Sequence, residues 1–210
     1  MLQNINDYLE QKVKKCFAHN VSFARHSGVL SVLCGRDKLI ELVHYLSSDL
    51  EFKFTMLVDA FAVDYPELSH RFEINYCFLS VEKNYRVNVK VKIKDGEDIP
   101  SLSSMYKNAV WLEREVWDMH GVKFSDNPDL RRLLTDYGFK GHPLRKDFPL
   151  SGYSEVRYDA IQEKVISEPV NLVQEYREFD FVSPWEGIDR QLPGDEKASE
   201  EVRERSNKDV

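Results

Sequence analysis

The chain has no long apolar run. Hydrophobic residues make up 42% of its 210 residues, yet no stretch approaches the roughly 18 consecutive apolar residues that a membrane-spanning helix needs. The first fifteen residues contain Asp7 and Glu10 and no apolar core, unlike a secretory signal or an Arg-rich transit peptide. The sequence therefore predicts a protein that stays in the compartment where it is made.

Cysteine is scarce. The three cysteines, Cys16, Cys34 and Cys77, are far apart and form no CxxC pair. An odd number at scattered positions argues against a disulfide framework and against an iron–sulfur or zinc site. We expect reduced, mostly buried thiols.

Glycine-rich phosphate-binding motifs, internal repeats and long basic stripes are also missing. The net charge is −7, and an acidic chain without a basic stripe is a poor match to nucleic-acid binding. The charge is uneven, because residues 131–158 hold six Lys or Arg against three Asp or Glu, whereas residues 161–210 hold seven against thirteen. A basic segment beside an acidic tail indicates protein contacts.

Alternating apolar residues predict three strands, at 52–60, 72–78 and 85–93. In the first we expect Phe52, Phe54, Met56, Val58 and Ala60 to face inward. Residues 82–84 should join the last two strands as a hairpin, and Ser27-Gly28 should join two shorter strands at 21–24 and 29–33.

Three helices are predicted on the same basis. Apolar residues recur at Ile5, Leu9, Val13 and Phe17, which favours a helix over residues 2–17. A second helix should run from a cap at Asp37 to about residue 48, with an inner face made of Leu39, Val43, Leu46 and Leu50. The third has Ala109, Leu112, Val116 and Met119 on one face and ends at Gly121.

This order of elements predicts an α+β fold with a mostly antiparallel sheet covered by helices on one face, followed by an extended C-terminal tail that wraps a partner. We assign residues 1–135 to the globular domain, 136–190 to an extended interaction segment and 191–210 to a disordered charged tail. Residues 130–137 favour one short helix, with Asp129 at its start.

Three acidic residues of the third helix are candidates for chemistry. Glu115 and Asp118 are three apart and should share a face, Glu113 lies on another, and Arg114 is spaced to pair with Asp118. We favour ion pairs over a metal site, because no histidine has the spacing to complete one.

The two histidines near this helix favour structural roles. His142 lies between Gly141 and Pro143, and no serine or cysteine nucleophile accompanies it, so we expect a turn. His120 follows the helix, where we expect it to cap a carbonyl or lie on the surface.

Basic residues interleaved with aromatic rings are the strongest interaction signal. Arginine makes two-pronged bonds to carboxylates, and arginine and tyrosine are enriched in protein interfaces. The basic members are Arg131, Arg132, Arg145, Lys146 and Arg157. Three functions stay open at this point: a non-catalytic subunit of a larger enzyme, a free-standing enzyme using the acids and histidines, and an RNA-binding domain using Arg86, Lys90 and Lys92.

A longer pattern narrows these options. Glu113-Arg114-Glu115, Asp118-Met119, Asp129-Leu130-Arg131-Arg132, Leu134-Thr135-Asp136-Tyr137-Gly138-Phe139 and the run from Gly141 to Leu150 resemble the C subunit of proton-pumping NADH:quinone oxidoreductase, respiratory complex I, known in mitochondria as Nad9. The resemblance extends upstream to about Phe54 and downstream to Trp185. The chain departs from the family pattern at His120 and at Asp126-Asn127.

The resemblance implies a cofactor-free subunit without a catalytic site, in an enzyme that passes electrons from NADH through FMN and iron–sulfur clusters to quinone. Its partners would be the large quinone-pocket subunit (the D subunit in bacterial naming) and neighbouring iron–sulfur subunits, with membrane contact only through the complex. It would lie on the cytoplasmic side of a bacterial inner membrane, or on the matrix side in mitochondria. The equivalent subunit of a membrane-bound hydrogenase is the alternative. The expected partner-binding residues are Glu113, Arg114, Glu115, Asp118, Arg131, Arg132, Asp136, Tyr137, His142, Arg145, Lys146, Asp147, Phe148, Tyr153, Arg157 and Trp185.

Overall fold

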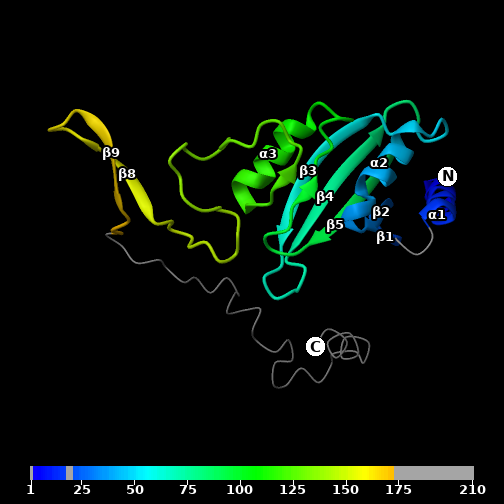
Figure 1. The fold of residues 1–210 in the computed structure, drawn as a ribbon, viewed down its shortest axis with the longest axis horizontal. Helices are drawn as coiled ribbons and strands as arrows, with labels where there is room; N and C mark the ends of the chain where they lie inside the picture. Colours follow the sequence, from blue (N-terminus) through cyan, green and yellow to red (C-terminus); the bar gives the residue numbers. More distant parts are fainter. Residues whose placement is uncertain (1, 18–20, 173–210) are drawn as a thin grey trace, which may run out of the picture. The chain divides into compact units, whose positions relative to one another are not determined.

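The computed structural model describes residues 2–17 and 21–172, with side chains from Asn6 onward (Figure 1). Ile5 as a core residue, Trp185 as a contact and the charged tail at 191–210 are therefore predictions that lie outside the described residues. So does the interaction segment beyond Leu172.

A five-stranded sheet forms the body of the protein, in the order β1-β2-β5-β4-β3. Its strands are β1 (Val21–His26), β2 (Val29–Cys34), β3 (Met56–Asp64), β4 (Phe72–Ser80) and β5 (Tyr85–Ile93). All neighbouring strands are antiparallel except β2 and β5, which are parallel. The α+β class is confirmed, with a mixed sheet.

Both predicted hairpins are present. Ser27 and Gly28, between β1 and β2, both have left-handed φ angles, of 50° and 80°. Two such residues in a row suit the right-handed twist of paired strands. β4 and β5 are joined by residues 81–84 and pair along their whole length.

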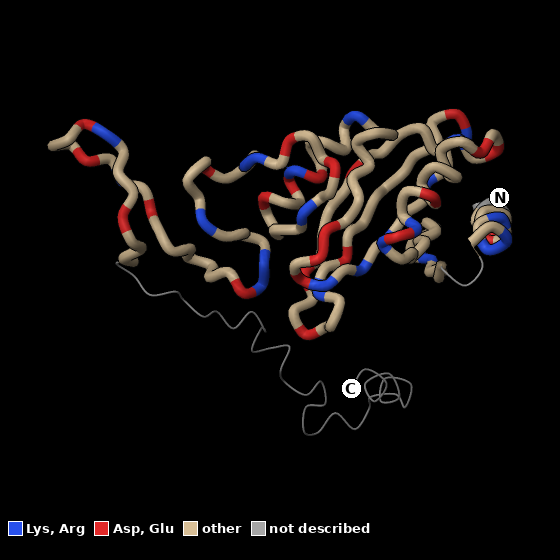
Figure 2. The backbone as a smooth tube through the Cα atoms, in the orientation of Figure 1, with Lys and Arg blue, Asp and Glu red and all other residues tan. Residues whose placement is uncertain are grey.

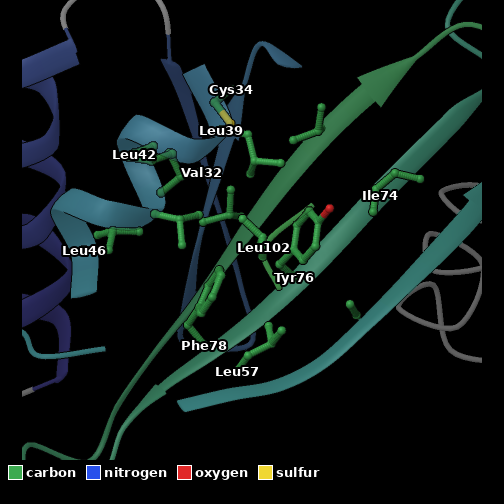
Figure 3. Packing of buried hydrophobic residues seen from close by; sticks show 14 of the residues in the cluster. Val32, Cys34, Leu39, Leu42, Leu46, Leu57, Ile74, Tyr76, Phe78 and Leu102 are labelled. Atoms are coloured by element: carbon green, nitrogen blue, oxygen red, sulfur yellow. The ribbon is translucent and has the colours of Figure 1, made fainter. Parts of the chain in front are cut away.

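Helices cover the apolar face of the sheet. They are α1 (Leu2–Phe17), α2 (Leu39–Ser48) and α3 (Ala109–His120), with a 3-10 turn, η2, at Arg36–Lys38. Figure 3 shows Leu42 and Leu46 of α2 lying over Val32 of β2, with Tyr76 and Phe78 of β4 in the same core.

The predicted inner faces of the helices are largely confirmed. Leu9, Val13 and Phe17 of α1 are buried, and so are Leu39, Val43 and Leu46 of α2 and Ala109, Val116 and Met119 of α3. Leu50 was predicted wrongly, because it follows the end of α2 and is 79% exposed. Asp37 lies inside η2 and its side chain caps no helix.

The first predicted strand has the wrong start and, in part, the wrong inner face. Phe52 and Phe54 are buried but precede β3, whereas Met56 and Val58 point to solvent and Leu57 is buried. The register with β4 shifts between Leu57 and Asp59, a bulge that adds one residue to β3. Such a bulge changes which residues face the core, so Leu57 and Ala60 both point inward.

The remaining elements are short. β6 (Ile99–Pro100) pairs in parallel with β7 (Phe124–Ser125), and β8 (Ser154–Asp159) pairs with β9 (Lys164–Pro169) in a hairpin that was not predicted. No described helix is long and apolar enough to span a bilayer. All three thiols are free, but only Cys34 is buried, which corrects the expectation of mostly buried thiols.

Candidate functional site: a segment held by charged clamps

The chain after α3 forms the candidate site. We call residues 127–170 the post-helix segment; Figure 2 shows both signs of charge along it. α3 ends at Gly121, whose φ of 80° is left-handed. A Cβ atom at Gly121 would lie 2.7 Å from Cδ2 of His142. Only glycine therefore allows the His142 ring to pack against the end of the helix.

A set of charged contacts around Asp118, which we call the first clamp, holds residues 131–135. The Asp118 carboxylate is fully buried, and Oδ2 accepts hydrogen bonds from the backbone N–H groups of Leu133, Leu134 and Thr135 at 2.9, 2.8 and 3.1 Å. Oδ1 accepts bonds from Arg132 Nη1 at 2.9 Å and Thr135 Oγ1 at 2.6 Å. Burial acts to raise the pKa of Asp118, but these donors outweigh it and lower the pKa well below its usual range.

This clamp explains why residues 130–137 form no helix. Three consecutive N–H groups point at one carboxylate instead of at carbonyls four residues back. The predicted short helix is therefore wrong. The Asp118 carboxylate, and not a helix, fixes the backbone of these residues.

Two arginines complete the first clamp. Arg114 donates to the carbonyls of Arg131 and Arg132, both at 2.7 Å, and to Asp129 at 3.2 Å. Arg132 bonds Asp118 and lies over the Trp117 ring, 5.3 Å from its centroid. The predicted pairing of Arg114 with Asp118 is therefore wrong; the residues that pair across the clamp lie about fifteen positions apart in the sequence.

Glu113 holds a different loop. Its buried carboxylate accepts bonds from Ser101 Oγ at 2.6 Å, the N–H of Leu102 at 2.7 Å and Asn127 Nδ2 at 2.8 Å. No cation compensates it within the described residues, and burial raises the pKa of Glu113 despite these donors. Asn127, at which the chain departs from the family pattern, is therefore a hydrogen-bond donor to this carboxylate.

Glu115 behaves differently from both neighbours. It is exposed, whereas Asp118, three residues on along the same helix, is buried. Among the described residues no three His, Cys, Asp or Glu side chains come together in a group that could hold a metal ion.

A second clamp, which the sequence did not reveal, holds residues 145–147. Asp64 at the end of β3 accepts two bonds from Arg71, at 2.7 and 2.8 Å, and one from the N–H of Lys146 at 2.8 Å. Arg71 also contacts Asp147 at 3.1 Å, which lowers the pKa of Asp147 to about 2. Arg145 donates to Asp95 at 2.5 Å.

The contacts of Arg145 differ from those that the sequence predicted. Its side chain is 19% exposed and meets two carboxylates of its own chain, Asp95 and Asp147. The sequence pattern had predicted a partner's carboxylate there. Asp64, Arg71 and Asp95 were missed because they lie at the ends of β3, β4 and β5, up to 82 positions from the residues they hold.

His142 and His120 both have structural surroundings. His142 Nδ1 bonds the carbonyl of Asp118 at 2.9 Å, and the N–H of Leu144 bonds that of Met119 at 3.0 Å. His120 is buried edge-on against Phe72, and burial lowers its pKa. Its Nδ1 makes no hydrogen bond within the described part of the chain, so the predicted cap or surface role is wrong.

Large apolar side chains are displayed on the outer side of the post-helix segment. Tyr137 is 87% exposed, Leu150 83% and Ile161 95%. The others are Leu134, Leu144, Tyr153, Val156, Tyr158 and Val165. So many exposed apolar side chains in one segment favour an interaction surface.

The predicted contact residues therefore divide into two groups. The first group is held in the clamps: Glu113, Arg114, Asp118, Arg132, His142, Arg145 and Asp147. The second group is exposed: Glu115, Arg131, Asp136, Tyr137, Lys146, Tyr153 and Arg157, with Phe148 half-buried. The clamps fix the backbone, and the exposed residues are free to touch another molecule.

Comparison with known proteins identifies the family of the chain. The family model for the "Respiratory-chain NADH dehydrogenase, 30 Kd subunit" matches residues 32–154. The C subunit of the NADH-quinone oxidoreductase of Ruegeria pomeroyi is 50% identical over 197 residues, covering 93% of this chain and 96% of that protein.

Two solved structures share the fold. The trypsin-resistant fragment (1-134) of Nqo5 has a TM-score of 0.51 and 26% identity, covering 58% of this chain and 98% of the fragment. A chain of the membrane-bound sulfane sulfur reductase, an archaeal respiratory membrane complex, has a TM-score of 0.58 and 26% identity, covering 70% and 86%. From the family match and the bacterial relative, the chain belongs to the family of the 30 kDa subunit of respiratory-chain NADH dehydrogenase, which is the C subunit of the NADH-quinone oxidoreductase complex, respiratory complex I.

Proposed function

We propose that this chain is a non-catalytic docking subunit that binds the large quinone-pocket subunit and neighbouring iron–sulfur subunits through its post-helix segment. It binds no cofactor; FMN and the iron–sulfur clusters belong to other subunits, and it has no nucleic-acid partner. The complex places it on the cytoplasmic side of a bacterial inner membrane, or on the matrix side in a mitochondrion.

The observation that carries this proposal is the contrast between the charges that hold the post-helix segment and its exposed apolar side chains. The buried carboxylates that hold it, Asp64 and Asp118, accept hydrogen bonds from donors of the same chain, while rings and aliphatic side chains such as Tyr137, Leu150 and Ile161 are exposed. An isolated two-stranded hairpin such as β8–β9 is marginally stable in water. A partner that covers these side chains gains their burial, about 1.5–3 kcal/mol each.

The other readings have less support. The carboxylates Glu113 and Asp118 are occupied by internal donors, and His142 bonds a backbone carbonyl, which disfavours a free-standing enzyme. Lys90 and Lys92 both contact Glu73, which weakens a basic RNA-binding face. A hydrogenase-type complex fits the shared fold but not the 50% identity to a subunit of an NADH-quinone oxidoreductase.

The first test is limited trypsin digestion of the free chain beside the assembled complex. We expect rapid cleavage of the free chain at Lys140, Arg157 and Lys164, which are exposed, and protection in the complex. The trypsin-resistant fragment 1-134 of Nqo5 supports this expectation, because that relative has a resistant piece that covers 58% of this chain. Equal cleavage of the two samples contradicts the proposal.

The second test compares two exposed leucines. Leu150→Asp places a charge on the post-helix segment, whereas Leu50→Asp places one at a leucine that is 79% exposed at the end of α2. Both variants should unfold like the wild type. Because about 1.4 kcal/mol is tenfold in an equilibrium constant, Leu150→Asp should lower the yield of assembled complex at least about tenfold, and Leu50→Asp should not.

A further inference from the structure

The post-helix segment contains an aromatic hollow, which we call the aromatic cup. It is lined by Phe139, Lys140, Phe148, Tyr153, Ser154 and Ser167, and its volume is about 390 Å³. It joins the turn-rich part of the segment to strands β8 and β9. The volume lies within the roughly 300–1,000 Å³ of pockets that enclose small ligands.

Three neighbouring aromatic rings form its wall. The centroids of Phe139 and Phe148 are 5.9 Å apart, and those of Phe148 and Tyr153 are 5.3 Å apart with nearly perpendicular planes. Gly141, with a φ of 101°, passes under Phe148, and a Cβ atom there would lie 2.8 Å from the ring. The backbone is therefore shaped to let the Phe148 ring lie where it does.

The first clamp fixes one side of the cup. Arg132, which bonds Asp118, also donates to the carbonyl of Phe139 at 3.0 Å and lies 5.8 Å from its ring centroid. The second clamp fixes the other side, because the N–H of Phe148 bonds the carbonyl of Arg145. The ring side of the cup is therefore held in place by the clamps, which lowers the entropy cost of binding.

Charge indicates the chemistry of the occupant. Lys140 is exposed at the cup and makes no ion pair within the described part of the chain. Residues 131–158 carry an excess of three positive charges. An apolar hollow beside a free cation suits a large apolar side chain with a carboxylate next to it.

We propose that the aromatic cup is an anchor pocket, in which a partner subunit of the complex inserts one large apolar side chain while an adjacent Asp or Glu pairs with Lys140. This inference rests on the proposed docking function and names the place where docking is strongest. Anchors of this kind carry a large part of the binding free energy of an interface.

Filling the cup is the direct test. Ser167→Trp puts a ring into the hollow from β9, and Ser104→Trp, at an exposed turn before α3, is its control. Both variants are expressed with the other subunits, and assembled complex is measured on native gels. We expect at least a tenfold loss for Ser167→Trp alone, with the thermal unfolding of the isolated chains unchanged.

A second measurement, cross-linking from the position of Lys140, leaves the aromatic cup unfilled. A photo-reactive amino acid replaces Lys140 in the assembled, purified complex, and the cross-linked peptide is identified by mass spectrometry. We expect one peptide of another subunit that contains a large apolar residue beside Asp or Glu. Cross-links that stay within this chain, or that reach a peptide without a large apolar residue, overturn the proposal.

The outcomes separate the two proposals. If Leu150→Asp impairs assembly but Ser167→Trp does not, docking stands and the anchor pocket is refuted. If neither variant impairs assembly, both proposals are refuted.

Discussion

Asp118 offers the sharpest test of how the post-helix segment is held. In Asp118→Asn the remaining oxygen can still accept from Arg132 and Thr135, but an amide NH₂ replaces the oxygen that accepts from three backbone N–H groups. Donor would then face donor. Removing one partner of a buried charged pair costs about 3–5 kcal/mol, so we expect a loss of this size in the free energy of unfolding.

The assay is thermal unfolding of the isolated chain, with Glu115→Gln as the control. Glu115 lies on the same helix, three residues away, and is exposed. Each kcal/mol shifts the midpoint by about 2–4 °C in a domain of 150–250 residues, so Asp118→Asn should unfold about 10 °C below the control. Hydrogen exchange at Leu133–Thr135 should also accelerate. Unfolding within about 1 °C of Glu115→Gln, less than the shift expected for a single kcal/mol, would refute the clamp.

Three further predictions concern the same contacts. Glu113→Gln should stay within about 1 kcal/mol of the wild type in thermal unfolding. Burial disfavours the charge of Glu113 and raises its pKa, and a neutral Gln can keep one oxygen on the N–H of Leu102 while its NH₂ donates to the hydroxyl of Ser101. A loss of about 3 kcal/mol, the size expected for a broken buried pair, would contradict this. Lowering the pH below about 4 should unfold the chain progressively. Four carboxylates have lowered pKa values in the folded chain, and the stability that they contribute is lost as the pH falls through those values; they are Asp64, Asp95, Asp118 and Asp147. A shallower acid transition in Asp118→Asn than in the wild type checks this assignment. Gly121→Ala should lower the free energy of unfolding by at least about 1 kcal/mol more than Gly28→Ala. Both glycines have left-handed φ angles, but only Gly121 faces a side chain, that of His142. Equal losses of the two variants in urea unfolding would exclude a clash with His142.

The sequence predicted what depends on local patterns. Apolar periodicity located α1 and α3, and turn residues located the hairpins around Ser27-Gly28 and residues 81–84. It did not predict the bulge in β3. The only sign of the extra residue in the apolar–polar alternation is Leu57, an apolar residue at a position where the pattern expects a polar one. It also did not predict the parallel pairing of β2 with β5, which depends on the crossover between them.

The clamps were hidden for a related reason. Local spacing suggested that Arg114 pairs with Asp118 four residues away, but each found a partner on the post-helix segment. The Asp64–Lys146 contact spans 82 residues, and nothing near Asp64 in the sequence distinguishes it from any acidic residue at the end of a strand. Contacts set by tertiary folding are not visible in the spacing of neighbours.

The position of the second clamp has a consequence for assembly. Asp64, Arg71 and Asp95 come together only when β3, β4 and β5 have paired. Until then Asp64, Arg71 and Asp95 are not in position to hold residues 145–147. The second clamp, and with it the docking surface proposed above, therefore requires that β3, β4 and β5 have paired. A chain with an unpaired sheet lacks the second clamp, so the proposed docking function implies that recruitment into the complex selects for folded copies.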